Sequence, residues 1–208
     1  MKPTAVMVLA FALIAVTARA DDDTPEDQRM RFIERDEDLT VTTTISKLFD
    51  SAAYAALDSG FSATVEIQLW VYPKGSTQPI AYARLVRSVV YDLWDEIYTL
   101  RVGERTLRVK QKSEALKELY SLDDVPVAKL SDMPYDAIYS LAIRADLNPV
   151  SKETLAEVRR WLSQGTGGGI DHSGAFFGSF VSVFVNPKIP ESDRVLRLRS
   201  QPFFRPRP

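Results

Sequence analysis

The chain has 208 residues, of which 45% are hydrophobic and 26% are charged, and its formal net charge is −2. This is the composition of a globular protein, and the length fits one domain with extensions. The absence of cysteine excludes disulfides, thiol catalysis, iron–sulfur clusters and cysteine-ligated zinc. The single histidine, His172, excludes metal sites built from several histidines. The sequence therefore assigns no catalytic, metal-binding or cofactor-binding residue.

The first 20 residues predict a secretory signal peptide. Lys2 precedes an apolar run over residues 5–16, and Ala18 and Ala20 form a cleavage site followed by three aspartates. The apolar run is shorter than the roughly 20 residues that cross a bilayer as a helix. We expect an exported chain, periplasmic or secreted, with no transmembrane segment after cleavage. Cleavage removes Lys2 and Arg19 and leaves 24 basic against 28 acidic residues, which does not indicate a nucleic-acid partner.

Charge and apolar content divide the rest of the chain into three parts. Residues 21–38 are acidic and poor in apolar side chains, which predicts a mostly disordered leader. Residues 39–200 are expected to form a single domain. Residues 201–208 form a tail rich in proline and arginine.

Alternation of apolar and polar residues predicts a fold made mainly of antiparallel strands. The clearest strand covers residues 61–72, and its hairpin partner at 80–91 follows turn residues at 73–76. Further strands are expected at 39–44, 97–102, 106–110, 137–147 and 194–200. Helices are expected at 45–57, at 113–120 and from residue 151 onward. The predicted fold class is α+β, an antiparallel β-sandwich of seven or eight strands with three or four short helices.

Three segments carry a resemblance to a known family. They are Leu-Asp-Ser-Gly-Phe at 57–61, Tyr-Asp-Leu-Trp-Asp-Glu-Ile-Tyr at 91–98, and the strand at 139–147. Over about residues 39–150 the chain resembles an uncharacterised family of exported proteobacterial proteins, the domain of unknown function DUF4390. The resemblance implies export and a β-rich fold. The family has no established activity, so no catalytic residue is carried over.

Three carboxylates lie within five residues between two predicted strands, at Asp92, Asp95 and Glu96. Paired carboxylates can transfer protons or bind Ca²⁺, which makes a carboxylate-dependent hydrolase one hypothesis. The spacing is not that of a calcium loop, and acidic residues are common in turns. The favoured interpretation is a solvated strand connection. Its packing aromatics are expected to be Tyr91, Trp94 and Tyr98.

The glycine-rich stretch 165–172 predicts a flexible loop. It follows a predicted helix and lacks the lysine of a phosphate-binding loop, which disfavours nucleotide binding. We expect His172 to be an exposed residue of this loop.

The apolar segment 176–185 is the strongest candidate for an interaction surface. Its aromatic residues are Phe176, Phe177, Phe180 and Phe184. The segment is too short to cross a bilayer as a helix. Packing against its own domain is favoured because four exposed phenylalanines promote aggregation. Contact with a membrane interface or with a partner protein is the alternative.

The expected function is binding. The signal peptide, the strand pattern and the lack of a catalytic constellation indicate an exported, non-enzymatic module of the periplasm or cell envelope, with a protein or lipid partner. Two alternatives stay open. One is a peripheral membrane protein that attaches through residues 176–185, and the other is a hydrolase that uses Asp92, Asp95 and Glu96.

Overall fold

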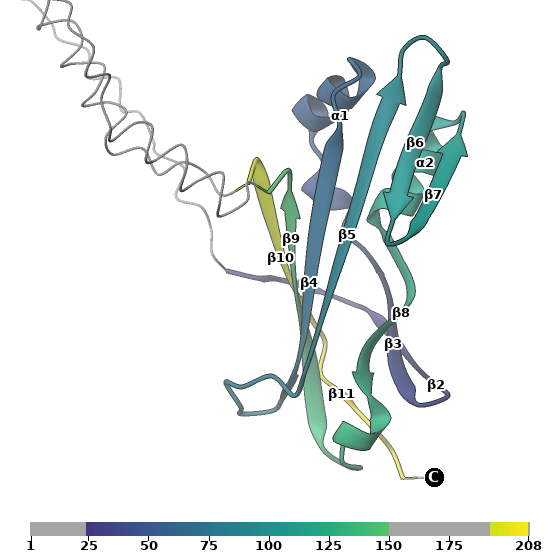
Figure 1. The fold of residues 1–208 in the computed structure, drawn as a ribbon. Helices are drawn as coiled ribbons and strands as arrows, with labels where there is room; N and C mark the ends of the chain where they lie inside the picture. The colour runs from purple at the N-terminus through teal and green to yellow at the C-terminus, as the bar shows by residue number, and fades with distance from the viewer. Residues whose placement is uncertain (1–23, 150–191, 208) are drawn as a thin grey trace, which may run out of the picture.

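The structure is a computed structural model that describes residues 24–149 and 192–207. In these residues the fold is mostly β, with two sheets and two α-helices (Figure 1). The strands are β1 (Glu26–Gln28), β2 (Arg31–Arg35), β3 (Asp38–Thr44), β4 (Ala63–Pro73), β5 (Ala81–Asp92), β6 (Ile97–Val102), β7 (Arg105–Val109), β8 (Ser121–Lys129), β9 (Ile138–Leu147), β10 (Arg194–Ser200) and β11 (Phe203–Phe204). The helices are α1 (Ser51–Asp58) and α2 (Lys112–Tyr120), with 3-10 turns η1 (Ser46–Leu48) and η2 (Leu130–Asp132).

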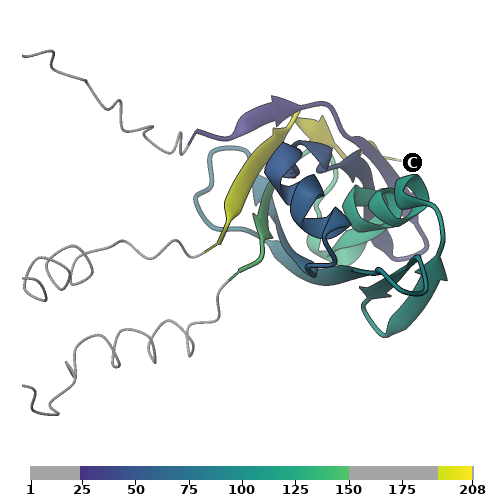
Figure 2. The same ribbon diagram turned by 90° about the horizontal axis from the view of Figure 1, so that it is seen from above.

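The large sheet has eight strands among the described residues, in the order β1-β10-β9-β4-β5-β6-β7, with β11 added to β9. The small sheet has the order β2-β3-β8. All pairings are antiparallel except that of β1 with β10, which is parallel. The large sheet is therefore mixed, whereas the sequence predicted an antiparallel fold. Seen from above, the strands form an incomplete ring around α1, with α2 beside it (Figure 2).

The long strands confirm the alternation read from the sequence. In β4, Val65, Ile67, Leu69 and Val71 are fully buried, and the residues between them are half-buried. β4 lies between β5 and β9, so it is central in the large sheet. The strand predicted at 61–72 is shifted, because Phe61 and Ser62 precede β4 and Pro73 is its last residue; Phe61 is exposed. Side chains from both sheets and from α2 join one buried cluster.

The first predicted helix is shorter than the apolar stripe suggested. Leu48, in η1, and Ile45, just before η1, are both buried. α1 begins only after Asp50. The Asp50 side chain accepts a hydrogen bond from the backbone N–H of Ala53 at 2.9 Å, which caps the first turn. Leu57 is the buried residue of α1. The helix predicted at 113–120 is confirmed as α2.

The prediction that residues 21–38 form a mostly disordered leader is corrected by the structure, because part of this segment forms the strands β1 and β2. β1 pairs with β10, and β2 pairs with β3. The side chain of Gln201 donates to the carbonyl of Met30 at 2.6 Å and accepts from its N–H at 2.9 Å. Asp27 also pairs with Arg199 at 2.9 Å. These partners lie about 170 positions away in the sequence, so local composition does not reveal them.

The proline- and arginine-rich tail is also part of the fold. β11 pairs with β9, and the ring of Phe203 stacks on that of Phe32 at 3.9 Å between centroids. Arg205 donates to the carbonyl of Leu130 at 2.7 Å, and its Nε lies 3.4 Å from a carboxylate oxygen of Glu34. Strands β1, β2 and β11 thus lie outside the predicted bounds of 39–200 and pair with strands inside them.

Several predicted features lie outside the described residues. They are the signal peptide at 1–20, the helix from 151, the glycine-rich stretch at 165–172 and the segment 176–185. The described residues contain two α-helices, where three or four were predicted for the chain. None of the helices in the described residues is both long and apolar enough to cross a membrane.

Candidate binding surface at the end of the large sheet

Four strands of the large sheet meet at one of its ends. β4 begins there and β5 ends there, and the same end holds the last residue of β9 and the first residue of β10. Leu147 is paired with both Val65 and Arg194, which fixes this arrangement. α1 lies over the same end of the molecule (Figure 2).

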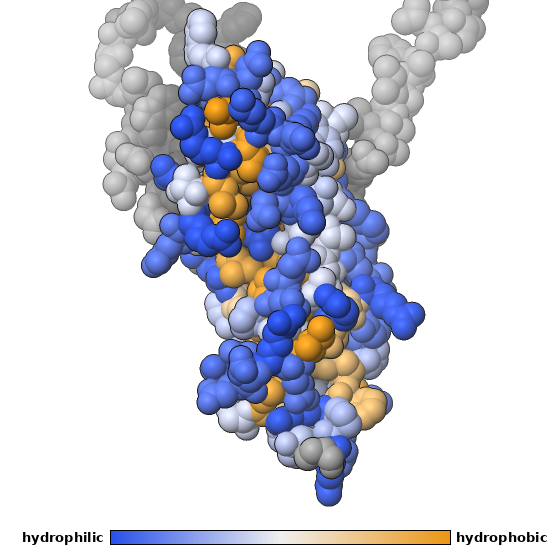
Figure 3. All heavy atoms as spheres, turned by 90° about the vertical axis from the view of Figure 1, so that its right-hand side faces the viewer, coloured by the Kyte–Doolittle hydropathy of each residue, from blue (hydrophilic) through white to orange (hydrophobic). Residues whose placement is uncertain are grey.

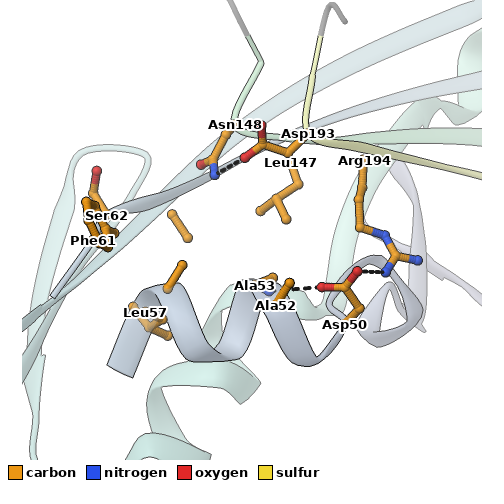
Figure 4. Close-up of a pocket in the computed structure, with 12 residues that line it drawn as sticks. Asp50, Ala52, Ala53, Leu57, Phe61, Ser62, Leu147, Asn148, Asp193 and Arg194 are labelled. Atoms are coloured by element: carbon orange, nitrogen blue, oxygen red, sulfur yellow. Dashed lines mark hydrogen bonds and ion pairs between the residues drawn. The ribbon is translucent and has the colours of Figure 1, made fainter. Parts of the chain in front are cut away.

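A pocket of about 240 Å³ lies between α1 and these strand ends (Figure 4). On one side, Asp50 forms an ion pair with Arg194 at 2.6 Å in addition to its bond with Ala53. On the other side, Asn148 donates a hydrogen bond to Asp193 at 2.7 Å. Asp50 and Arg194 are therefore paired with each other, and the carboxylate of Asp193 accepts a hydrogen bond from a neutral amide.

Local contacts hold the polar residues of the pocket in place. Asn148 has a φ of +49° and closes the end of the sheet, because it exchanges two hydrogen bonds of 2.7 and 2.8 Å with the backbone of Thr64. The pKa of Asp50 is lowered, first by the N–H of Ala53 and then by Arg194. The volume is below the roughly 300–1,000 Å³ of typical ligand pockets.

Three large apolar side chains are exposed at this end of the large sheet, and one of them, Phe61, lines the pocket. Phe61 is 68% exposed, Leu93 is 56% exposed and Trp94 is 96% exposed. The segments that carry them are adjacent, because Gly60, which precedes Phe61, lies against Leu93: a Cβ at Gly60 would stand 3.2 Å from Leu93 Cδ1. We call Phe61, Leu93 and Trp94 the apolar tip. Exposed apolar groups of this kind mark interaction sites, and tryptophan is enriched among the residues that dominate binding energy.

The predicted acidic cluster lies at the end of β5 and in the connection to β6, on the same turn as Leu93 and Trp94 of the apolar tip. Asp92 accepts hydrogen bonds from the backbone N–H groups of Asp95, at 3.1 Å, and Trp94, at 2.9 Å, and these bonds lower its pKa. Asp95 lies 3.4 Å from Arg108, and Glu96 is exposed with a φ of +52°. No group of three His, Cys, Asp or Glu side chains in the described part of the chain is placed to hold a metal ion.

The prediction that Trp94 packs with the neighbouring tyrosines is wrong. The rings of Tyr91 and Tyr98 stack at 4.5 Å, and Tyr98 is buried. Trp94 points away because the residues between Asp92 and Ile97 form a turn and leave the alternation of the strands. The turn is built by the side chain of Asp92, which is a common role of aspartate.

Sequence reasoning missed Arg87, a buried cation of β5. Its guanidinium donates to the backbone carbonyls of Glu118 at 2.8 Å, Leu119 at 3.3 Å and Ser121 at 2.6 Å. Burial lowers its pKa. The last turn of a helix leaves carbonyl groups without partners, and Arg87 satisfies those of α2. The signal was present in the sequence, because Arg87 is the only charge among the inward-facing positions of the strand predicted at 80–91.

The predicted interaction residues Phe176, Phe177, Phe180 and Phe184 lie outside the described residues. The described chain stops at Pro149 and resumes at Ser192, which adjoin the ends of β9 and β10. The apolar tip is thus a candidate surface that does not depend on these phenylalanines.

Comparisons with known proteins identify one family. A family model described as a domain of unknown function, DUF4390, matches residues 23–157. The match spans β1 to β9 and includes both α-helices of the described residues. No curated protein and no solved structure matches the chain.

Proposed function

The chain belongs to the DUF4390 family, a domain of unknown function, and we propose that it is an exported, non-enzymatic binding module of the cell envelope. The observation that carries the proposal is the 96% exposure of Trp94 beside Leu93 and Phe61. In this proposal the apolar tip is the binding surface. The two sheets, arranged as a β-sandwich, hold the tip in place.

A binding role explains features of the tip that packing does not. A side chain as large as that of Trp94 loses favourable burial when it stands in water. In binding surfaces, tryptophan supplies a large contact area with only two rotatable bonds, and it fills a pocket of the partner. The small pocket beside Phe61 offers a reciprocal site for one partner side chain.

Charge indicates the chemistry of the partner. Asp92, Asp95 and Glu96 surround Leu93 and Trp94 on the same turn. Their negative charge disfavours contact of the tip with an anionic lipid surface. It favours a protein surface with an apolar pocket and basic side chains at its rim. The partner that we propose is therefore a protein of the envelope.

The signal peptide predicted from the sequence at residues 1–20 supports the proposal of export. Attachment to a membrane through residues 176–185 stays a prediction, because those residues are not among the described ones. No observation favours the hydrolase. Hydrogen bonds from its own turn hold Asp92 in the charged form, and Asp95 lies beside Arg108.

The absence of cysteine allows a direct test in cells. One variant carries Ser62→Cys, at an exposed residue of the pocket next to Phe61, and its matched control carries Lys74→Cys, at an exposed turn residue after β4. A membrane-impermeant maleimide is applied to cells with a permeabilised outer membrane and to the purified proteins. Both thiols are expected to react in the purified chains. In cells, the control is expected to react and Ser62→Cys to be protected.

A second substitution assigns the protection to the tip. Adding Trp94→Ser to the Ser62→Cys variant is expected to restore labelling in cells to the level of the control. Equal labelling of the two single variants in cells would contradict binding at the tip. Labelling of the Lys74→Cys control only after the inner membrane is broken would contradict export.

A further inference from the structure

One long strand of the large sheet has a neighbour along only part of its length. β5 pairs with β4 from Ala81 to Val89, but it pairs with β6 only from Arg87 to Asp92. β6 ends at Val102, where a turn with Gly103 at a φ of +59° leads into β7. Within the described residues, the segment 81–86 of β5 therefore has a strand on one side only. We call this segment the free edge.

A groove of about 310 Å³ lies along part of this free edge, between β5 and β8. Its lining residues include Leu85 and Val86 of β5 and Val125 of β8. Figure 3 shows the side of the molecule on which β7 and β8 lie, and apolar side chains form a strip there between hydrophilic ones. The hydrogen bond of 2.6 Å between Arg87 and the carbonyl of Ser121 holds the two strands together where β8 begins.

The free edge lacks the features that protect most sheet edges from pairing, which are charges, prolines and bulges. Its only charged residue is Arg84, whose guanidinium is held by two hydrogen bonds of 2.8 Å to Glu66 on β4. No shift of register interrupts its pairing with β4. β8, across the groove, is different: Pro126 has no backbone N–H, and Asp124 has a φ of +50° at an irregular part of its pairing with β3.

We propose that the free edge binds an extended peptide segment of a partner protein by strand addition. Unpaired backbone N–H and C=O groups along a strand are satisfied by another extended backbone, which is the basis of this type of recognition. Six residues of β5 span about 20 Å and accept a peptide strand of similar length.

The lining of the groove specifies the peptide. Apolar side chains at alternate positions of the peptide would lie on the face of the sheet that carries Leu85, and the residues between them on the face that carries the exposed Val86. A basic side chain would lie near Asp123, which is exposed, while the two arginines of the groove are already held, Arg84 by Glu66 and Arg87 by backbone carbonyls. This site uses the free edge and not the apolar tip. It can therefore be tested independently of the proposed function.

The test uses a phage-displayed library of random twelve-residue peptides, selected on the purified chain. A selected peptide is then synthesised, and amide hydrogen exchange of the chain is measured with and without it. We expect selected sequences with alternating apolar residues and a lysine or arginine. We also expect exchange to slow at least tenfold for amides in 81–86, with no change in β7, an edge strand of the same sheet.

Two matched substitutions test the charge, and one tests the location. Asp123→Lys is expected to weaken binding of the peptide at least tenfold, whereas Asp132→Lys, at an exposed aspartate of η2, leaves it unchanged. Trp94→Ser is also expected to leave it unchanged. A library without binders, protection elsewhere than in 81–86, equal effects of the two lysine substitutions, or loss of binding in Trp94→Ser would each overturn the proposal. Concentration-dependent dimerisation that protects 81–86 without peptide would assign the edge to a second copy and overturn it as well.

Discussion

The guanidinium of Arg87 lies 2.6 Å from the carbonyl oxygen of Ser121 and donates a hydrogen bond to it. This contact joins β5 of the large sheet to the first residue of β8 in the small sheet. The same guanidinium also bonds the carbonyls of Glu118 and Leu119 at the end of α2. One buried side chain thus connects two strands from different sheets with the helix between them.

Replacement of Arg87 tests this connection. Arg87→Met keeps an apolar side chain of similar length but leaves the carbonyls of Glu118, Leu119 and Ser121 without their donor. Each buried group that loses its partner costs about 1–3 kcal/mol, so we expect the free energy of unfolding to fall by at least about 2 kcal/mol. Urea unfolding followed by circular dichroism measures it. The control Arg108→Met removes an exposed cation and is expected to change stability by less than about 0.5 kcal/mol. Equal effects of the two substitutions would contradict the role of Arg87.

Trp94 and Tyr98 lie four positions apart, and their contributions to stability differ. Tyr98→Ala removes a buried ring and is expected to lower the free energy of unfolding by about 3–5 kcal/mol. Trp94→Ala removes an exposed ring, and the expected change is within about 0.5 kcal/mol. Urea unfolding measures both. If Trp94→Ala loses as much stability as Tyr98→Ala, then Trp94 packs in the core and its assignment as an exposed residue is contradicted.

Two glycines with similar backbone angles separate strain from crowding. Gly60 has a φ of +84° and Gly75 a φ of +80°, and both favour glycine. A Cβ would meet Leu93 at 3.2 Å in the first case and nothing within 4 Å in the second. Gly75→Ala is expected to lower the free energy of unfolding by about 1–2 kcal/mol from backbone strain alone. Gly60→Ala is expected to lower it further, because its Cβ also meets Leu93.

A double mutant checks the assignment of that difference. In a Leu93→Ala background, the costs of Gly60→Ala and Gly75→Ala should become similar when compared by thermal and urea unfolding. If the excess cost of Gly60→Ala persists without the Leu93 side chain, the contact that groups Phe61 with the β5–β6 turn is not the cause.

Acidity weakens the cap of α1. The pKa of Asp50 lies below its usual value because the N–H of Ala53, and then Arg194, bind its charged form. The carboxylate therefore stabilises the fold above the unfolded-state pKa of about 3.9. This stabilisation is lost as the pH falls through the lower pKa of the folded state. Asp50→Ala is expected to unfold at lower urea concentration than the native chain at pH 7, with a difference that shrinks below pH 4.

The substitution Asp50→Asn separates the two partners of this residue. Asparagine keeps the cap but loses the ion pair with Arg194. Its urea midpoint at pH 7 is expected to lie between those of Asp50→Ala and the native chain. A difference between Asp50→Ala and the native chain that stays constant from pH 7 to pH 3 would contradict the assignment.

The strands that alternate clearly could be predicted from the sequence. β4 and β9 have one buried face, and β5 has one face less exposed than the other, so their period of two is visible in the residues. β1 and β2 could not be predicted in this way. Their order depends on distant partners such as Gln201 and Arg199, and residues like Glu26 and Arg31 are typical of solvated segments. β8 was missed because Asp124 and Pro126 interrupt its apolar pattern.

The candidate site was predictable only in part. The sequence placed Asp92, Asp95 and Glu96 in a strand connection; Asp95 and Glu96 lie in it, and Asp92 is the last residue of β5. It did not reveal the exposure of Trp94, because a turn of a few residues rotates side chains out of the alternation of the flanking strands. It also gave no indication of the free edge of β5, since the length of β6 relative to β5 depends on the turn at Gly103.

Site-specific photo-crosslinking in intact cells tests the central claim most directly. A benzophenone amino acid replaces Leu93 in one variant and the exposed Lys110 in another. We expect a discrete adduct of higher mass from position 93 only, and we expect Trp94→Ser to abolish it. The same adducts from both positions, or none from position 93, would contradict the proposal that the apolar tip binds a partner in the cell envelope.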